Sequence, residues 1–252
     1  MKTLKIQSYG LTDTGTVRSS NQDAFCCDEA ALLFGVADGM GGHRGGEVAS
    51  HLSLKAISDF LQPYQNAPKE NWSHLMRTSV QIACREVYDR SLEEISLFGM
   101  GTTATIMKIF DSHACIAHVG DSRLHLVRAG FLYQITKDHS LVQEQVDAGL
   151  LTQEEASHHR LRHVVSRCVG YQPDELVDVY TLKLENSDRI LITSDGLHQY
   201  VSDEFIIDMV QSSPKEACQK SISRATEAGS DDNMTAVVVA FDREIPEKKR
   251  AV

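Results

Sequence analysis

The stretch Gly101–Ile135 reads GTTATIMKIFDSHACIAHVGDSRLHLVRAGFLYQI, and it decides the fold class. It is rich in β-branched and apolar residues with a period of two, which predicts strands. Two short turns, Asp111-Ser112 and Ala129-Gly130, separate successive strands as hairpins would. The strands expected from this pattern are 101–109, 113–119, 123–128 and 131–135. Consecutive hairpins indicate an antiparallel sheet.

The segments on either side of this stretch predict helices in pairs and further strands. Apolar residues recur four apart over Gly46–Leu61, a helix that Pro63 ends, and a longer helix is expected over Trp72–Ile95. The other expected helices are 143–150, 152–159, 203–211 and 214–228, and the other strands are 4–8, 31–37, 176–184, 189–193 and 234–241. Two clusters of strands with helix pairs between them predict an α+β fold. We expect a four-layer αββα sandwich, in which two face-to-face antiparallel sheets are flanked by helix pairs.

Composition limits the class of protein. The chain has 252 residues, with 42% hydrophobic and 24% charged residues, which is ordinary for a soluble globular domain. We expect one domain over 1–242, followed by a charged tail over 243–252. The formal net charge of −10 disfavours binding to nucleic acid or to an anionic membrane. The six cysteines form no CxxC pair, which fits free thiols in a reducing cytoplasm.

Aspartates follow the ends of apolar segments in a repeated pattern. The motifs are VADG at 36–39, VGDS at 119–122, TSDG at 193–196, GSDDN at 229–233 and NQD at 21–23. Each Asp-Gly alone is typical of a β-turn, and the residues after Ala37, Asp38–Gly42, are expected to form a loop. Several strand-end carboxylates in one domain would repel one another unless cations neutralised them. Oxygen ligands without His or Cys favour Mg²⁺ or Mn²⁺.

The sequence resembles the metal-dependent protein phosphatases, also called the protein phosphatase 2C family, in their compact bacterial form. The resemblance extends from about Ser8 to Phe241. The matching blocks are DTGTVRSSNQDAF, VADGMGGHRGGEVAS, GTTAT, HVGDSRLHLVRAG, ITKDHSLVQEQVDAGLLT, ITSDGLHQYVSD and GSDDNMTAVVVAF. The family fold implied by the resemblance agrees with the sandwich predicted from the strand pattern.

The resemblance also implies a set of metal ligands. Asp38 is expected to bridge two metal ions, with the Gly39 carbonyl on one of them. Asp195 and Asp232 are expected to complete the ligands of the first ion. Asp231 replaces Asp232 if the register of that block differs.

Two further aspartates and one arginine take roles by the same resemblance. Asp23 is expected to support the second ion through water, and Asp121 to help bind a third, weaker one. The two core ions, Mg²⁺ or Mn²⁺, are expected to share a water whose hydroxide attacks phosphorus directly. Arg18, which is otherwise a surface arginine, is expected to grip the phosphate.

Histidines raise the remaining questions. His43 is expected either to donate a proton to the leaving alkoxide or only to order its loop. Residues 138–170, called the flap below, resemble a family segment that influences substrate access. Its histidines, His158, His159 and His163, suggest a metal site or a pH sensor, but exposed polar side chains on a loop are the favoured interpretation.

The function expected from all these features is hydrolysis of phosphoserine and phosphothreonine in proteins by a monomeric cytoplasmic enzyme. Its partners would be phosphorylated proteins and a cognate bacterial Ser/Thr kinase whose action it opposes. Two alternatives are a catalytically weak regulatory or binding module of the same fold and a phosphoesterase for small molecules.

Overall fold

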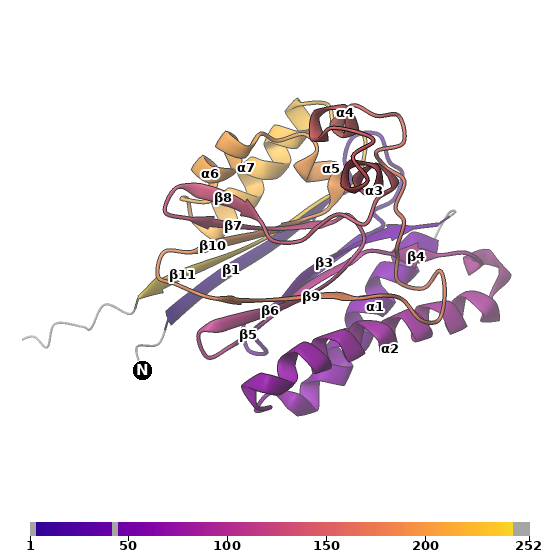
Figure 1. Ribbon diagram of the computed structural model, residues 1–252, viewed down its shortest axis with the longest axis horizontal. Helices are drawn as coiled ribbons and strands as arrows, with labels where there is room; N and C mark the ends of the chain where they lie inside the picture. The colour runs from indigo at the N-terminus through magenta and orange to yellow at the C-terminus, as the bar shows by residue number, and fades with distance from the viewer. Residues whose placement is uncertain (1–3, 42–44, 244–252) are drawn as a thin grey trace, which may run out of the picture.

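The computed structural model describes residues 4–41 and 45–243, which form two antiparallel sheets packed face to face (Figure 1). One sheet has the strand order β1-β11-β10-β7-β8, and the other has the order β2-β3-β5-β6-β9 with β4 paired to β3. The strands are β1 Leu4–Asp13, β2 Asp23–Asp28, β3 Leu33–Met40, β4 Gly101–Thr102, β5 Ala104–Phe110, β6 His113–Val119, β7 Arg123–Arg128, β8 Phe131–Gln134, β9 Asp178–Lys183, β10 Arg189–Thr193 and β11 Met234–Arg243. The predicted α+β sandwich is confirmed.

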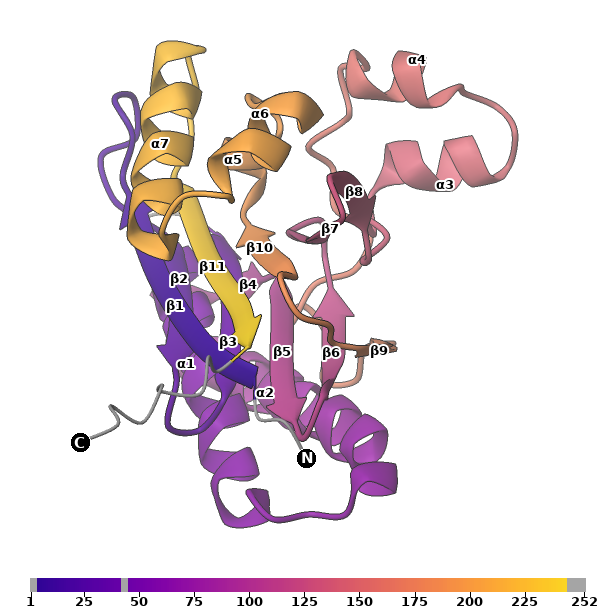
Figure 2. The same ribbon diagram turned by 90° about the vertical axis from the view of Figure 1, so that its left-hand side faces the viewer.

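Helices cover the outer face of each sheet (Figure 1). The pair α1 and α2 packs on the sheet that contains β3, and α5, α6 and α7 pack on the sheet that contains β11. Two short helices, α3 and α4, stand beyond one end of the sheets (Figure 2). The helices are α1 Gly45–Leu61, α2 Trp72–Glu93, α3 Leu141–Asp147, α4 Gln153–Ser157, α5 Asp195–His198, α6 Asp203–Met209 and α7 Pro214–Glu227, with 3₁₀ turns at Gln62–Tyr64, Lys69–Asn71 and Ile95–Leu97.

Strand β11 shows how the sequence builds the layers. Val237, Val239 and Phe241 point between the two sheets, where they pack with residues of β3, β5 and β10. Ala236 and Val238 alternate with them and face the helices on the outside. Both faces of the strand are therefore buried, which explains the uninterrupted apolar run from Ala236 to Phe241.

The loop expected at Asp38–Gly42 is wrong for its first three residues. Asp38, Gly39 and Met40 continue strand β3, and Gly39 pairs with Thr102 of the short strand β4. The strand expected over 101–109 is accordingly split at Thr103. The Thr103 backbone N–H donates to the Asp38 carbonyl (2.8 Å), and its hydroxyl accepts from the Asp38 N–H (2.8 Å).

Several element boundaries also differ from the prediction. Strand β2 and helix α5 were not expected, because the sequence of β2, DAFCCD, does not alternate apolar and polar residues and α5 has only four residues. The predicted helix over Trp72–Ile95 ends at Glu93. Arg243, expected to begin the tail, ends β11, and the rest of that tail lies outside the described residues. In the ranges described, no helix is both long and apolar enough to cross a membrane.

Candidate metal centre

A cavity of about 450 Å³ lies where the ends of β3 and β10 meet the loops before β2 and β11. It is lined by Arg18, Gln22, Asp38, Gly39, Met40, Gly41, Asp121, His163, Val165, Asp195, Asp231, Asp232 and Asn233. The structure thus brings five of the six predicted metal ligands into the lining of one cavity. The sixth, Asp23, is the register partner of Asp38 across β2 and β3.

Asp23 is buried beneath the cavity, where two hydroxyl groups bind its carboxylate. Its Oδ2 accepts hydrogen bonds from Ser194 Oγ (2.7 Å) and Thr235 Oγ1 (2.6 Å). Its Oδ1 is also buried and has no hydrogen-bond partner in the described part of the chain. The pKa of the Asp23 carboxyl is raised to about 7, chiefly by burial and also by the charges of Asp195 and Asp232, although the two hydroxyl hydrogen bonds lower it.

Asp38 and Gly39 approach the first turn of α1 closely. A side chain at Gly39 would overlap the Gly46 and Gln22 carbonyl oxygens, so only glycine fits there. Burial raises the pKa of Asp38 well above its usual value, and neighbouring carboxylates, Asp23 first, raise it further. The strand therefore presents a carboxylate whose charge is poorly compensated.

Asp195 comes shortly after β10 and Asp121 shortly after β6, and both line the cavity. Asp195 is the first residue of α5, and its Oδ2 accepts from Gln199 Nε2 (3.1 Å). Asp121 follows Gly120, whose positive φ of 109° and contact with Thr103 require glycine. Burial raises the pKa of Asp121 well above normal, and the nearby charge of Asp195 adds to this effect.

Asp231 and Asp232 are adjacent in the sequence but have different partners. Asp232 Oδ2 forms an ion pair with Arg18 Nη2 (2.7 Å), while Asp231 Oδ1 accepts from the Tyr200 hydroxyl (2.7 Å). Burial raises the pKa of Asp232, whereas the Tyr200 hydrogen bond lowers that of Asp231. The pKa of Asp232 is thus raised like those of Asp38 and Asp121, which is consistent with Asp232 rather than Asp231 as the ligand.

Asn233 is a residue of the centre that the sequence analysis did not single out. Its Nδ2 donates to the carbonyls of Thr14 (2.9 Å) and Ser20 (3.0 Å), and its Oδ1 accepts from Gln22 N–H (2.8 Å). These bonds hold the loop that carries Arg18 against the start of β11. The Asn that follows Asp231-Asp232 was a visible signal, but its distant partners were not.

The carboxylates fit a hard cation by charge and chemistry. Buried aspartates with raised pKa values and one unpaired buried oxygen are stabilised when a cation enters. Within 4–41 and 45–243, however, no three His, Cys, Asp or Glu side chains are already arranged to hold one ion. The cavity therefore brings five predicted ligands near one another without assembling a complete coordination shell.

The histidines are placed separately. His163 lines the cavity, with its Nδ1 3.5 Å from Asp195 Oδ2. His158 and His159 make only local contacts in the flap, His158 with Ser157 Oγ (2.9 Å) and His159 with the Leu161 N–H (3.2 Å). The three do not form one cluster. His43, the proposed proton donor, lies outside the described residues.

Comparison with known proteins identifies the class. The family model described as protein phosphatase 2C matches residues 10–234. Protein phosphatase PhpP of Streptococcus pneumoniae is 34% identical over 243 residues, which cover 93% of this chain and 97% of that protein. Serine/threonine phosphatase stp of Listeria monocytogenes is 32% identical over 245 residues, which cover 95% and 96%.

Solved structures agree with the sequence matches. The serine/threonine phosphatase PstP/Ppp of Mycobacterium tuberculosis superposes with a TM-score of 0.87 at 33% identity, covering 95% of this chain and all of that one. The catalytic domain of PstP in complex with two manganese ions superposes with a TM-score of 0.85, at the same identity and coverage. Fold and site thus define a metal-dependent serine/threonine phosphatase. The chain belongs to the protein phosphatase 2C family.

Proposed function

We propose that the chain dephosphorylates phosphoserine and phosphothreonine in cytoplasmic proteins and opposes a Ser/Thr kinase there. The single observation that carries the proposal is the cavity in which aspartates from four distant segments meet Arg18. The names of the bacterial relatives support the reaction, and the open cavity suits an exposed phosphorylated loop. We propose Mg²⁺ or Mn²⁺ as the ion, with two core sites and a weaker third, in a monomeric enzyme.

The proposed ligands are those that the family resemblance implies, and their place in and beneath one cavity supports them. Asp38 and the Gly39 carbonyl would hold the core ions with Asp195 and Asp232, while Asp23 would support them from beneath. Asp121 would serve the third site at the edge of the cavity. Divalent cations bound there make water more acidic and offset the charge of the phosphate.

The chain's own residues supply binding and orientation. Arg18 is held by the Asp231 carbonyl (Nε to O, 3.3 Å) beside Asp232, at the cavity wall. Its guanidinium can turn a planar pair of donors towards a phosphate. Asn233 fixes the loop behind Arg18, so that this donor pair stays beside the carboxylates.

Metal removal is the direct test. The purified protein is expected to hydrolyse p-nitrophenyl phosphate and phosphothreonine peptides with added Mn²⁺ or Mg²⁺, and to lose this activity in EDTA. Readdition of metal should restore it, which serves as the control for damage by the chelator. Full turnover in EDTA would exclude the metal-dependent mechanism.

The neighbouring pair Asp231 and Asp232 offers a matched test of the ligand set. Asp232→Asn is expected to weaken Mn²⁺ binding and lower kcat by about a hundredfold, because a ligand of the core site is lost. Asp231→Asn should change either quantity by less than about threefold, since Asp231 binds Tyr200. The reverse order of the two effects would assign the ligand to Asp231.

A further inference from the structure

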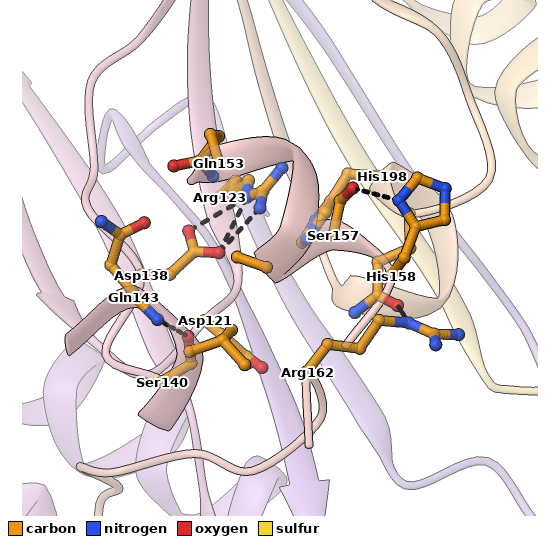
Figure 3. Close-up of a pocket in the computed structure, with 13 residues that line it drawn as sticks. Asp121, Arg123, Asp138, Ser140, Gln143, Gln153, Ser157, His158, Arg162 and His198 are labelled. Atoms are coloured by element: carbon orange, nitrogen blue, oxygen red, sulfur yellow. Dashed lines mark hydrogen bonds and ion pairs between the residues drawn. The ribbon is translucent and has the colours of Figure 1, made fainter. Parts of the chain in front are cut away.

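A second cavity of about 440 Å³ adjoins the metal centre under the flap (Figure 3). Its walls come from α3, α4, the segment after α4 and the end of α5, and Asp121 lines both cavities. A phosphorylated loop that places its phosphate beside Arg18 has flanking residues that must lie somewhere on this surface. The second cavity is the nearest recess described for them.

The charges on its walls leave one cation uncompensated. Arg123 and Asp138 neutralise each other through three hydrogen bonds of 2.8–3.1 Å, drawn opposite Arg162 in Figure 3. Arg162 forms no ion pair with any described residue, and its guanidinium makes one hydrogen bond, from Nε to Gln199 Oε1 (3.3 Å). Both Nη nitrogens are without a partner among the residues described.

Gln199 orients this guanidinium. Its amide oxygen accepts from Arg162, and its amide nitrogen donates to Asp195 Oδ2 (3.1 Å). The half-buried Arg162 is therefore fixed relative to the metal centre, rather than free on the surface. Asp121, which forms no ion pair with a described residue, lines both cavities and is counted with the metal centre.

We propose that this cavity binds an anionic side chain flanking the phosphorylated residue, with Arg162 as its recognition group. The inference rests on the proposed function above, because it takes the phosphoprotein as the ligand. A planar guanidinium with free Nη donors matches a carboxylate or phosphate in a bidentate contact. The anion is either Asp or Glu or a second phosphorylated residue, which share that chemistry.

Binding measurements can test the pocket without relying on turnover. The probes are alanine-rich peptides in which a non-hydrolysable phosphonate replaces the phosphothreonine ester. One flanking position at a time carries Ala, Glu, Lys or a second phosphonate. Kd is measured by calorimetry with the Mn²⁺-loaded full chain. Glu at one position is expected to lower Kd by about tenfold relative to Ala.

Two variants separate recognition from folding. Arg162→Glu is expected to reverse the preference at that position, so that Lys binds more tightly than Glu, a gain that an unfolded protein cannot show. Arg160→Glu is the matched control, since Arg160 is exposed on the same segment and does not line the cavity. It should keep the wild-type preference.

The outcomes distinguish the two proposals. Equal Kd values for Glu and Ala at every position, or a Glu preference that survives Arg162→Glu, would overturn the pocket assignment. Tighter binding of the second phosphonate than of Glu would identify a doubly phosphorylated ligand, and the opposite order an acidic residue. Failure to hydrolyse p-nitrophenyl phosphate with Mn²⁺ would overturn the proposed function while leaving the binding result to stand.

Discussion

The metal centre and the flap are neighbours that are held together in different ways. Asp23 in the centre binds Ser194 and Thr235, which are 171 and 212 residues away in sequence. The flap helix α4 is instead held by a capping box within four residues, between Thr152 and Glu155. Long-range contacts inside the sandwich therefore hold the Asp23 carboxylate of the centre in place. The flap can change its sequence without disturbing them.

The flap nevertheless has a firm base. Its first residues bond to the sheet through the His139 N–H and the Gly120 carbonyl (2.7 Å). Its far end returns through Arg167, whose Nη1 lies 3.2 Å from Asp178 Oδ1. Sequence differences among related proteins are therefore expected between His139 and Arg167, the segment that contains Arg162 and the three flap histidines.

Loss of a proposed metal ligand should have the largest effect on catalysis. Asp38→Ala is expected to lower kcat for p-nitrophenyl phosphate by roughly a thousandfold, since the proposed bridging carboxylate is lost. The free energy of unfolding of the metal-free protein should not fall, because a poorly compensated buried charge is removed. Steady-state kinetics and chemical denaturation measure the two quantities. A kcat within tenfold of wild type would contradict the assignment.

The electrostatic strain of the centre should appear as a pH dependence of stability. The pKa of Asp23 in the folded protein is about 7, above its ordinary 3.8. Between these two pH values the metal-free folded state therefore keeps a proton on Asp23 that the unfolded state loses. Its contribution to stability is present below pH 3.8 and is lost as the pH rises to 7, by the order of a few kcal/mol. Thermal unfolding of metal-free protein at several pH values measures this loss.

Metal and a single substitution provide the controls for that experiment. Mn²⁺ should raise Tm more at pH 8 than at pH 5, because protons compete with the ion for the carboxylates. Asp23→Asn should flatten the pH dependence between 4 and 7. If the variant and the wild type showed equal slopes, Asp23 would not be the group responsible.

Arg18→Ala tests binding at the edge of the centre. It is expected to raise KM by about tenfold, with a smaller change in kcat, because a charge-assisted contact with the phosphate is lost. Arg18→Lys keeps the charge but not the planar pair of donors. Its KM should therefore lie between those of the wild type and Arg18→Ala. Unchanged KM and kcat in Arg18→Ala would rule out the phosphate role.

The flap should show the smallest and most local effect. Thr152→Ala removes the α4 capping box and is expected to cost about 1 kcal/mol of local helix stability. Hydrogen exchange should quicken over 153–157 while p-nitrophenyl phosphate turnover stays constant. Ser213→Ala removes the equivalent box of α7, which packs on the sheet, and should instead lower the global Tm. Equal global destabilisation by both would refute the contrast.

The sequence predicted the parts of the molecule that repeat a local pattern. The hairpins of 101–135, the sandwich and the strand-end aspartates all follow from periodicity and short motifs, and the structure brings those aspartates to one cavity. The roles of individual ligands stay predictions. Local patterns could not show that β3 continues through Asp38, since that depends on pairing with β4 some sixty residues later.

Contacts between distant residues account for the rest of what was missed. Thr103, Ser194 and Thr235 look like ordinary strand residues, yet their hydroxyls position Asp38 and Asp23. Arg162 was not singled out by the sequence analysis. Its significance depends on Gln199 and on a cavity that no linear motif describes.

The pairing of the first and last strands has a consequence during protein synthesis. Strand β1 pairs along its length with β11, from Leu4 with Arg243 to Asp13 with Met234. Asp232 and Asn233 directly precede β11, so both the closing strand and part of the centre leave the ribosome after every other described helix and strand. Nascent chains are therefore expected to have no phosphatase activity, and a message truncated before Asp232 would yield fragments that cannot dephosphorylate anything.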